Sequence, residues 1–211
     1  MSPVDEHWPA HVRDRLEAKY LAGDNPRAQS GFGGDAAYWE VARGVIAEAV
    51  DRSGTFLDVG CASGHLVECM VEWCAARGCE IEPYGLDILP SMVDLAGSRL
   101  PQWRDRIVCG DARTWMPPRR FDFVRTELMY APDDEQELLV GHLLDAVVAP
   151  GGRLIVCAYG SRTRPDPRAE DLTERLAAWG HTVAGTRTAV VGDRVTTWVG
   201  WIQLPNSFGK S

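Results

Sequence analysis

The stretch Thr55-Phe56-Leu57-Asp58-Val59-Gly60-Cys61-Ala62-Ser63-Gly64-His65-Leu66 changes character twice. It begins as an apolar run, breaks into a turn of small residues at positions 60–64, and continues with apolar residues at helical spacing through Leu66, Met70 and Cys74. This pattern predicts a strand, a tight turn and a helix. Such a turn lets a ligand approach the backbone closely and presents free N–H groups at the start of a helix.

Two kinds of ligand-binding turn share this geometry. The dinucleotide fingerprint requires glycine at three positions, and this chain has Ala62 and His65 at the second and third when counted from Gly60. The other pattern alternates an acid, Gly, a small residue and Gly, and Asp58, Gly60, Ala62 and Gly64 fit it. Here the chain resembles the class I S-adenosylmethionine-dependent methyltransferases, whose first motif has this form. A glycine-rich connection without a ligand is the alternative.

Strand and helix patterns alternate along most of the chain. We expect strands at 55–59, 84–87, 107–109, 121–126, 153–158, 182–191 and 194–204, and helices at 9–22, 35–50, 65–77, 90–100, 133–147 and 168–179. This alternation predicts a parallel sheet with helices on both faces. Gly192-Asp193, between the last two strands, predicts a hairpin turn.

The closing hairpin extends the resemblance to residues 35–204. A doubly wound dinucleotide domain continues strand–helix–strand, whereas the class I family closes a seven-stranded, mostly parallel α/β sheet with one antiparallel strand, in the order 3-2-1-4-5-7-6. Pro150-Gly151-Gly152 also resembles the family's turn before strand five. The resemblance therefore implies a methyltransferase domain at 35–204, an N-terminal segment at 1–34 and a tail at 205–211.

Acids stand at or near the ends of three expected strands, at Asp58, Asp87 and Asp111. Ligands of open α/β sheets bind at these ends, and a carboxylate can accept two hydrogen bonds from a ribose diol. The resemblance assigns the ribose to Asp87 and the adenine to Asp111 and Ala112, although each acid can also be a solvated turn residue. The cofactor-binding residues that it implies are Asp58, Gly60, Cys61, Ala62, Gly64, Asp87, Ile88, Asp111, Ala112 and Thr126.

Glu127 is the candidate catalytic residue. With Thr126 it follows the fourth expected strand, where members of the family place residues near the methionine portion or the acceptor. An amine acceptor needs only positioning, whereas a hydroxyl usually needs a base. Glu127 can therefore act as a base, hold a substrate amine, or be solvated.

The first 34 residues are extra to the expected sheet. Their helix pattern carries Trp8, Val12, Leu16 and Tyr20 on one side, and Gly31, Gly33 and Gly34 surround Phe32. We predict a helical lid hinged at the glycines, with Tyr20, Phe32, Trp39 and Tyr130 bordering the acceptor. The alternatives are a plain linker, a cap on the core, or a helix buried against a second copy in a homodimer.

Composition limits the partners. A net charge of −8 argues weakly against nucleic acid, and the chain has no long apolar run and no signal-peptide pattern. The six cysteines have no paired spacing, which favours buried thiols over a metal site. We expect a cytoplasmic enzyme, not bound to a membrane, that methylates nitrogen or oxygen of a small molecule with S-adenosylmethionine. A nicotinamide-dependent oxidoreductase and a non-catalytic ligand-binding protein of the same fold are the alternatives.

Overall fold

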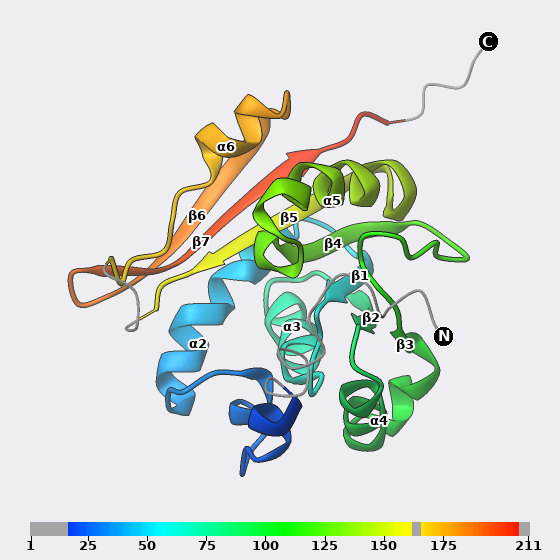
Figure 1. Ribbon diagram of the computed structural model, residues 1–211, viewed down its shortest axis with the longest axis vertical. Helices are drawn as coiled ribbons and strands as arrows, with labels where there is room; N and C mark the ends of the chain where they lie inside the picture. The colour runs from blue at the N-terminus through cyan, green and yellow to red at the C-terminus, as the bar shows by residue number, and fades with distance from the viewer. Residues whose placement is uncertain (1–16, 162–165, 207–211) are drawn as a thin grey trace.

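The computed structural model describes residues 17–161 and 166–206, which form a seven-stranded sheet between two layers of helices (Figure 1). The strand order is β3-β2-β1-β4-β5-β7-β6. The strands are β1 Gly54–Val59, β2 Ile81–Asp87, β3 Ile107–Cys109, β4 Phe121–Glu127, β5 Val148–Tyr159, β6 Val183–Val191 and β7 Arg194–Gln203. Only β7 runs against its neighbours β5 and β6, so the predicted order and the single reversed strand are confirmed.

The central strands are buried on both faces. Phe56 of β1 packs into the cluster formed with α2 (Ala36–Gly44) and α3 (His65–Ala76), whereas Leu57 packs into the cluster formed with α5 (Gln136–His142) and α6 (Thr173–Ala178). Helix α4 (Pro90–Arg99) lies beside α3 and covers β2 and β3. Burial on both faces explains why β1 reads as a continuous apolar run in the sequence.

The helix ends follow local sequence signals. The Asp35 side chain accepts a hydrogen bond of 2.8 Å from the backbone N–H of Tyr38 and so caps α2. Gly78, with φ of 79°, follows the end of α3. Pro90 occupies the first turn of α4. Helix α2 continues as the 3-10 turn η3 (Val45–Ala49), which completes the expected helix at 35–50.

Three expected elements differ from the prediction. The helix expected at 133–147 is a succession of η6 (Asp133–Glu135), α5 and the π-helical η7 (Leu143–Val147). The helix expected at 168–179 begins only at Thr173, because the Asp166 carboxylate and the Val195 carbonyl accept hydrogen bonds from the N–H groups of Arg168 and Ala169. Strand β5 begins at Val148, so the expected Pro-Gly-Gly turn lies within it as a bulge at Gly151, where φ is 72°.

The N-terminal segment is described from residue 17 onward. Residues 17–21 are helical, and η2 (Ala28–Ser30) precedes α2. Trp8, Val12 and Leu16, which carry most of the expected apolar face, lie outside the described residues. At the other end, the Pro205 carbonyl accepts from Gly151 N–H, and residues 207–211 of the expected tail are not described.

Among residues 17–161 and 166–206, no helix is long and apolar enough to cross a membrane, and His, Cys, Asp and Glu form no group of three suited to a metal ion. All six cysteines are free. Five are buried as expected, whereas Cys109, at the end of the short edge strand β3, is exposed.

Candidate active site

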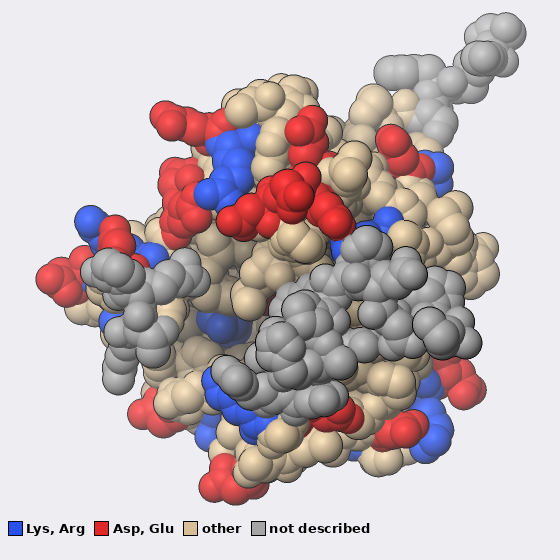
Figure 2. All heavy atoms as spheres, viewed as in Figure 1, with Lys and Arg blue, Asp and Glu red and all other residues tan. Residues whose placement is uncertain are grey.

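A cavity of about 1000 Å³ opens at the carboxyl edge of the sheet. Its walls come from the turn after β1, the ends of β2, β4 and β5, and residues 19–43 of the N-terminal segment and α2. Figure 2 shows a hollow on this face, with basic atoms inside it and acidic residues along its upper edge. The size is at the upper end of the usual range for ligand pockets, which leaves room for two bound molecules.

The turn after β1 is wound in the left-handed region at three alternating positions. Gly60 and Gly64 have φ of 74°, and Ala62 is the only described non-glycine residue with a positive φ, at 45°. The N–H groups of Gly60 and Cys61 both donate to the Leu86 carbonyl, at 2.7 and 3.1 Å, and tie the turn to β2. A left-handed alanine is strained, and such strain gathers at binding sites.

The two glycines of the turn serve different contacts. A Cβ at Gly60 would lie 2.3 Å from Cζ of Tyr130, which borders the cavity. A Cβ at Gly64 would instead lie 2.8 Å from Cδ1 of Leu100 and 3.3 Å from Cβ of Ala96. Gly64 does not line the cavity; its N–H donates to the Cys61 carbonyl, and the small residue lets α4 pack against the turn.

Asp87 ends β2 beside this turn. Its Oδ2 accepts a hydrogen bond of 2.7 Å from Ala62 N–H, and its Oδ1 accepts one of 2.9 Å from Leu89 N–H. Burial raises the pKa of Asp87, and the backbone N–H groups partly offset that rise. Each carboxylate oxygen can accept a second hydrogen bond, so Asp87 can bind a ligand without releasing the turn.

Asp111, Ala112 and Ile88 line the same cavity nearer β3. Asp111 is held by Arg113, whose Nε lies 3.0 Å from Oδ1 and whose Nη2 lies 2.6 Å from Oδ2. Arg113 also contacts Glu135 at 2.7 Å, and the Asp111 carboxylate raises its pKa. This ion-paired group closes the β3 end of the cavity.

Arg125, in the middle of β4, organises the floor of the cavity, and the sequence analysis missed it. Its side chain is 3% exposed, yet it lines the cavity. Nη1 donates to Oδ1 of Asp58 at 3.1 Å and to the Tyr130 hydroxyl at 3.1 Å. Nη2 donates to Oε1 of Glu127 at 2.5 Å and to the Tyr159 hydroxyl at 2.6 Å. Nε has no partner among the described residues.

Burial and the charge of Arg125 have opposite effects on the pKa of the neighbouring acid Asp58. Burial raises the pKa of Asp58 to about 6, although the neighbouring Arg125 charge acts in the opposite direction. Glu127 closes β4, and its Oε1 accepts from Tyr130 at 2.7 Å as well as from Arg125. Oε2 of Glu127 accepts no hydrogen bond from the described residues, so it is available to a ligand. A buried arginine within a central strand requires such partners, and that is the signal that could have revealed the network.

The four residues expected at the acceptor, Tyr20, Phe32, Trp39 and Tyr130, all line the cavity. The rings of Phe32 and Trp39 meet edge to face with centroids 5.1 Å apart. Ser30 Oγ lies 2.8 Å from Ser63 Oγ, which also donates to the Pro26 carbonyl. Residues 26–39 therefore dock directly on the glycine turn.

Of the remaining expected site residues, most line the cavity and one does not. Asp58, Gly60, Cys61, Ala62, Asp87, Ile88, Asp111, Ala112 and Glu127 border the cavity. Thr126 does not: it is fully buried, because it alternates with Arg125 and Glu127 along β4 and faces away from them.

Residues 56–152, which include the turn, Asp87 and β4, match the family model described as a methyltransferase domain. This match and the strand order, which is that of the class I methyltransferase fold, support a class I S-adenosylmethionine-dependent methyltransferase. The recognised region stops at the start of β5, so the acceptor-side residues before position 56 lie outside it.

The chain resembles a trans-aconitate 2-methyltransferase of Methylobacterium radiotolerans, with 34% identity over 139 residues. The match covers 65% of the chain and 47% of that relative, so the chain spans about half of the relative's length.

Two solved structures illustrate what the fold does and does not imply. A 1,6-didemethyltoxoflavin-N1-methyltransferase of Burkholderia thailandensis, with bound 1,6-didemethyltoxoflavin and S-adenosylhomocysteine, gives a TM-score of 0.64 at 16% identity and covers 93% of this chain and 88% of its own. The [4+2]-cyclase SpnF also gives 0.64, at 17% identity, and covers 94% and 96%. At such identities the likeness shows the fold alone, and the fold hosts more than one reaction.

Proposed function

We propose that the protein transfers a methyl group from S-adenosylmethionine to nitrogen or oxygen of a small molecule. The observation that carries this proposal is that the left-handed turn, Asp87 and Asp111 border one cavity together with Glu127 and the aromatic residues of the N-terminal segment. The match to the methyltransferase-domain model and the solved structure of similar fold with bound S-adenosylhomocysteine support the same cofactor.

The cofactor fits the residues at the ends of β1, β2 and β3. We assign the ribose hydroxyls to Asp87, whose oxygens retain acceptor capacity, and the adenine to Asp111 and Ala112. Gly60 and Asp58 would then lie along the methionine portion, and the negative charge of Asp58 would favour its ammonium group. When bound, S-adenosylmethionine supplies a methyl group already activated by the sulfonium charge.

The chain's own residues hold the acceptor and exclude water. Phe32 and Trp39 are buried apolar surfaces on one side of the cavity. Glu127 is fixed by Arg125 and Tyr130 through Oε1, and its Oε2 can accept a hydrogen bond from an amine or hydroxyl. We propose that Glu127 orients such a group, and that it takes a proton from a hydroxyl acceptor.

A small acceptor is supported by three observations. The cavity is walled by both the core and the N-terminal segment. Acids such as Asp133 and Glu170 stand among its lining residues, and the chain has a net charge of −8, which disfavours a phosphate backbone. The two methyltransferase relatives are named for small molecules, trans-aconitate and 1,6-didemethyltoxoflavin.

Calorimetry with S-adenosylhomocysteine and, separately, NADH tests the cofactor. We expect one molecule of S-adenosylhomocysteine to bind and NADH not to bind. Binding of NADH alone would support the oxidoreductase and overturn the proposal. Transfer of labelled methyl from S-adenosylmethionine to candidate acceptors then tests catalysis, and tight cofactor binding without transfer to any of them would favour the non-methylating alternative.

A further inference from the structure

Arg43 of α2 is a cation that lines the cavity from the side of the N-terminal segment. Its guanidinium lies 3.4 Å from the ring centroid of Tyr159, and 5.1 and 5.5 Å from those of Phe32 and Trp39. Within the described residues, its side chain donates one hydrogen bond, a long contact of 3.5 Å to the carbonyl of the preceding Ala42. Stacking on Tyr159 fixes the plane of the guanidinium and leaves its edge N–H groups to a ligand.

No carboxylate among the described residues forms an ion pair with Arg43. The other buried charged groups of the cavity have partners: Asp58 and Glu127 both pair with Arg125, Asp111 pairs with Arg113, and Asp87 accepts hydrogen bonds from backbone N–H groups. At the mouth, Arg175 pairs with Glu170 at 2.5 Å. The remaining cation that lines the cavity, Lys19, is exposed. Arg43 is therefore a half-buried cation of the cavity that forms no ion pair within the described residues.

Arg43 contacts a different part of the sheet from the residues that we assign to the cofactor. The turn, Asp87 and Asp111 follow β1, β2 and β3, which form one side of the sheet. Tyr159, on which Arg43 stacks, ends β5 on the opposite side of β4. A cofactor extended from β3 to β1 therefore has its reactive end toward β4, and Arg43 lies beyond that end.

We propose that Arg43 binds a carboxylate of the methyl acceptor, so that the substrates of this protein are organic acids. The assignment depends on the methyl-transfer function proposed above. An arginine fork matches the two oxygens of a carboxylate, and a partly desolvated, unpaired guanidinium gains most from such a partner. The apolar rings of Phe32 and Trp39 beside it would contact the carbon skeleton of the acid.

The test uses the full chain saturated with S-adenosylhomocysteine. Calorimetry measures the binding of trans-aconitate, citrate, benzoate and indole-3-acetate. Each acid is compared with its uncharged ester, in which every carboxylate is methylated. We expect at least one acid to bind the native protein more tightly than its ester does. Arg43→Gln should weaken that acid roughly tenfold to a hundredfold and leave the ester unchanged, whereas Arg43→Lys should give an intermediate loss.

Arg106→Gln is the matched control, because it removes the same charge at a distant position. Arg106 pairs with Glu82 at the opposite edge of the sheet. It should bind every probe as the native protein does. Unchanged affinity for S-adenosylhomocysteine shows that each Arg43 variant is folded.

Three results would overturn the assignment. The first is that no acid binds more tightly than its ester, and the second is that the preference for the acid survives in Arg43→Gln. The third is an equal loss of S-adenosylhomocysteine affinity in Arg43→Gln, which would place the amino-acid carboxylate of the cofactor on Arg43. If the native protein fails to bind S-adenosylhomocysteine at all, the methyl-transfer function itself is wrong and the assignment falls with it.

Discussion

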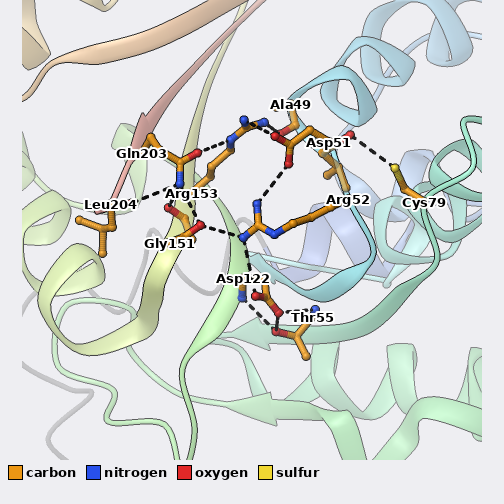
Figure 3. A network of polar contacts seen from close by, with 12 residues as sticks. Ala49, Asp51, Arg52, Thr55, Cys79, Asp122, Gly151, Arg153, Gln203 and Leu204 are labelled. Atoms are coloured by element: carbon orange, nitrogen blue, oxygen red, sulfur yellow. Dashed lines mark hydrogen bonds and ion pairs between the residues drawn. The ribbon is translucent and has the colours of Figure 1, made fainter. Parts of the chain in front are cut away.

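Each edge of the sheet carries an arginine network, and the two are built differently. At the amino edge, Arg52 donates to the Gly151 carbonyl at 2.8 Å and Arg153 donates to the Ala49 carbonyl at 2.8 Å (Figure 3). Asp51 contacts both arginines. The Arg52 side chain is 40% exposed, and the network connects strand ends and loops through backbone carbonyls.

The network at the carboxyl edge is enclosed, and most of its contacts join side chains. Arg125 is 3% exposed and is surrounded by two carboxylates and two phenol groups rather than by backbone carbonyls alone. Burying charges in this way is a poor route to stability, because desolvation opposes the attraction between them. The comparison indicates that the exposed network joins strand ends and loops at the surface with little effect on stability, whereas the buried one supplies charge to a cavity.

The largest expected effect is a difference in the free energy of unfolding between variants of the two networks. Arg125→Leu leaves Asp58 and Glu127 buried without their cation and should lower the free energy of unfolding by about 3–5 kcal/mol. Arg52→Leu removes an exposed arginine and should cost less than about 1 kcal/mol. Urea denaturation of both variants measures the difference, and equal losses would contradict the distinction between the networks.

Substitutions at the two glycines of the turn should change different properties, ligand affinity at Gly60 and stability at Gly64. Gly60→Val places its side chain on Tyr130 at the cavity wall and should lower S-adenosylhomocysteine affinity at least about a hundredfold, since the ligand loses close approach to the backbone. Gly64→Val clashes with Leu100 and Ala96 and should act on stability, by about 1–3 kcal/mol. Calorimetry and urea denaturation on both variants test this. A Gly64→Val protein of native stability that no longer binds the ligand would reverse these roles.

The buried acids should make ligand binding depend on pH. Asp58 has a pKa of about 6 in the free protein because of burial, so it carries its charge above pH 6 and loses it below. Since the ammonium group of the ligand prefers the ionised carboxylate, affinity should be level above pH 6 and fall by up to about tenfold per unit below it. Asp87, whose pKa burial also raises, adds to the fall.

Asp58→Asn is the variant that checks this origin. Its affinity should be lower at neutral pH and should change less between pH 6 and pH 5 than that of the native protein. An unaltered slope in Asp58→Asn would assign the pH dependence to Asp87 or to the ligand.

The smallest expected effect concerns the lid. Proteolysis between Leu21 and Gly34 should be slower with S-adenosylhomocysteine bound, because this segment lines the cavity in which we propose that the ligand binds. Ser63→Ala removes the contacts to Ser30 and to the Pro26 carbonyl, worth about 0.5–1.5 kcal/mol each, and should speed cleavage severalfold. If bound ligand gives no protection, and a chain starting at Asp35 still methylates its acceptor, the segment is not a lid.

The cofactor edge was predictable because its signals are local. The turn at 60–64 and the acids Asp87 and Asp111 follow strands that are evident as apolar runs, and parallel topology brings strand ends together. At the bulge, Gly151 N–H donates to the Pro205 carbonyl, and before α6 the Ala169 N–H donates to the Val195 carbonyl, and these partners are distant in sequence. Local propensity carries no information about such partners.

The acceptor side was only partly predictable for the same reason. Phe32 and Trp39 were predicted to border the acceptor and they line the cavity, but Arg43 and Arg125 were not predicted. Arg125 gains its role from Asp58 and Tyr159, which lie on the neighbouring strands β1 and β5. Only the register of the assembled sheet shows that these three side chains meet.

The central claim is that the carboxyl edge of β1 and β2 binds S-adenosylmethionine, with the ribose on Asp87. The most direct measurement is the calorimetric affinity for S-adenosylhomocysteine of the native protein, Asp87→Ala and Asp87→Asn, with the exposed Asp145→Ala as the control for lost charge. Asp87→Ala should weaken binding roughly tenfold to a hundredfold through the loss of a charge-assisted acceptor. Asp87→Asn should weaken it less, and Asp145→Ala should leave it unchanged. An Asp87→Ala protein that binds as tightly as the native one would contradict the claim and place the ribose elsewhere.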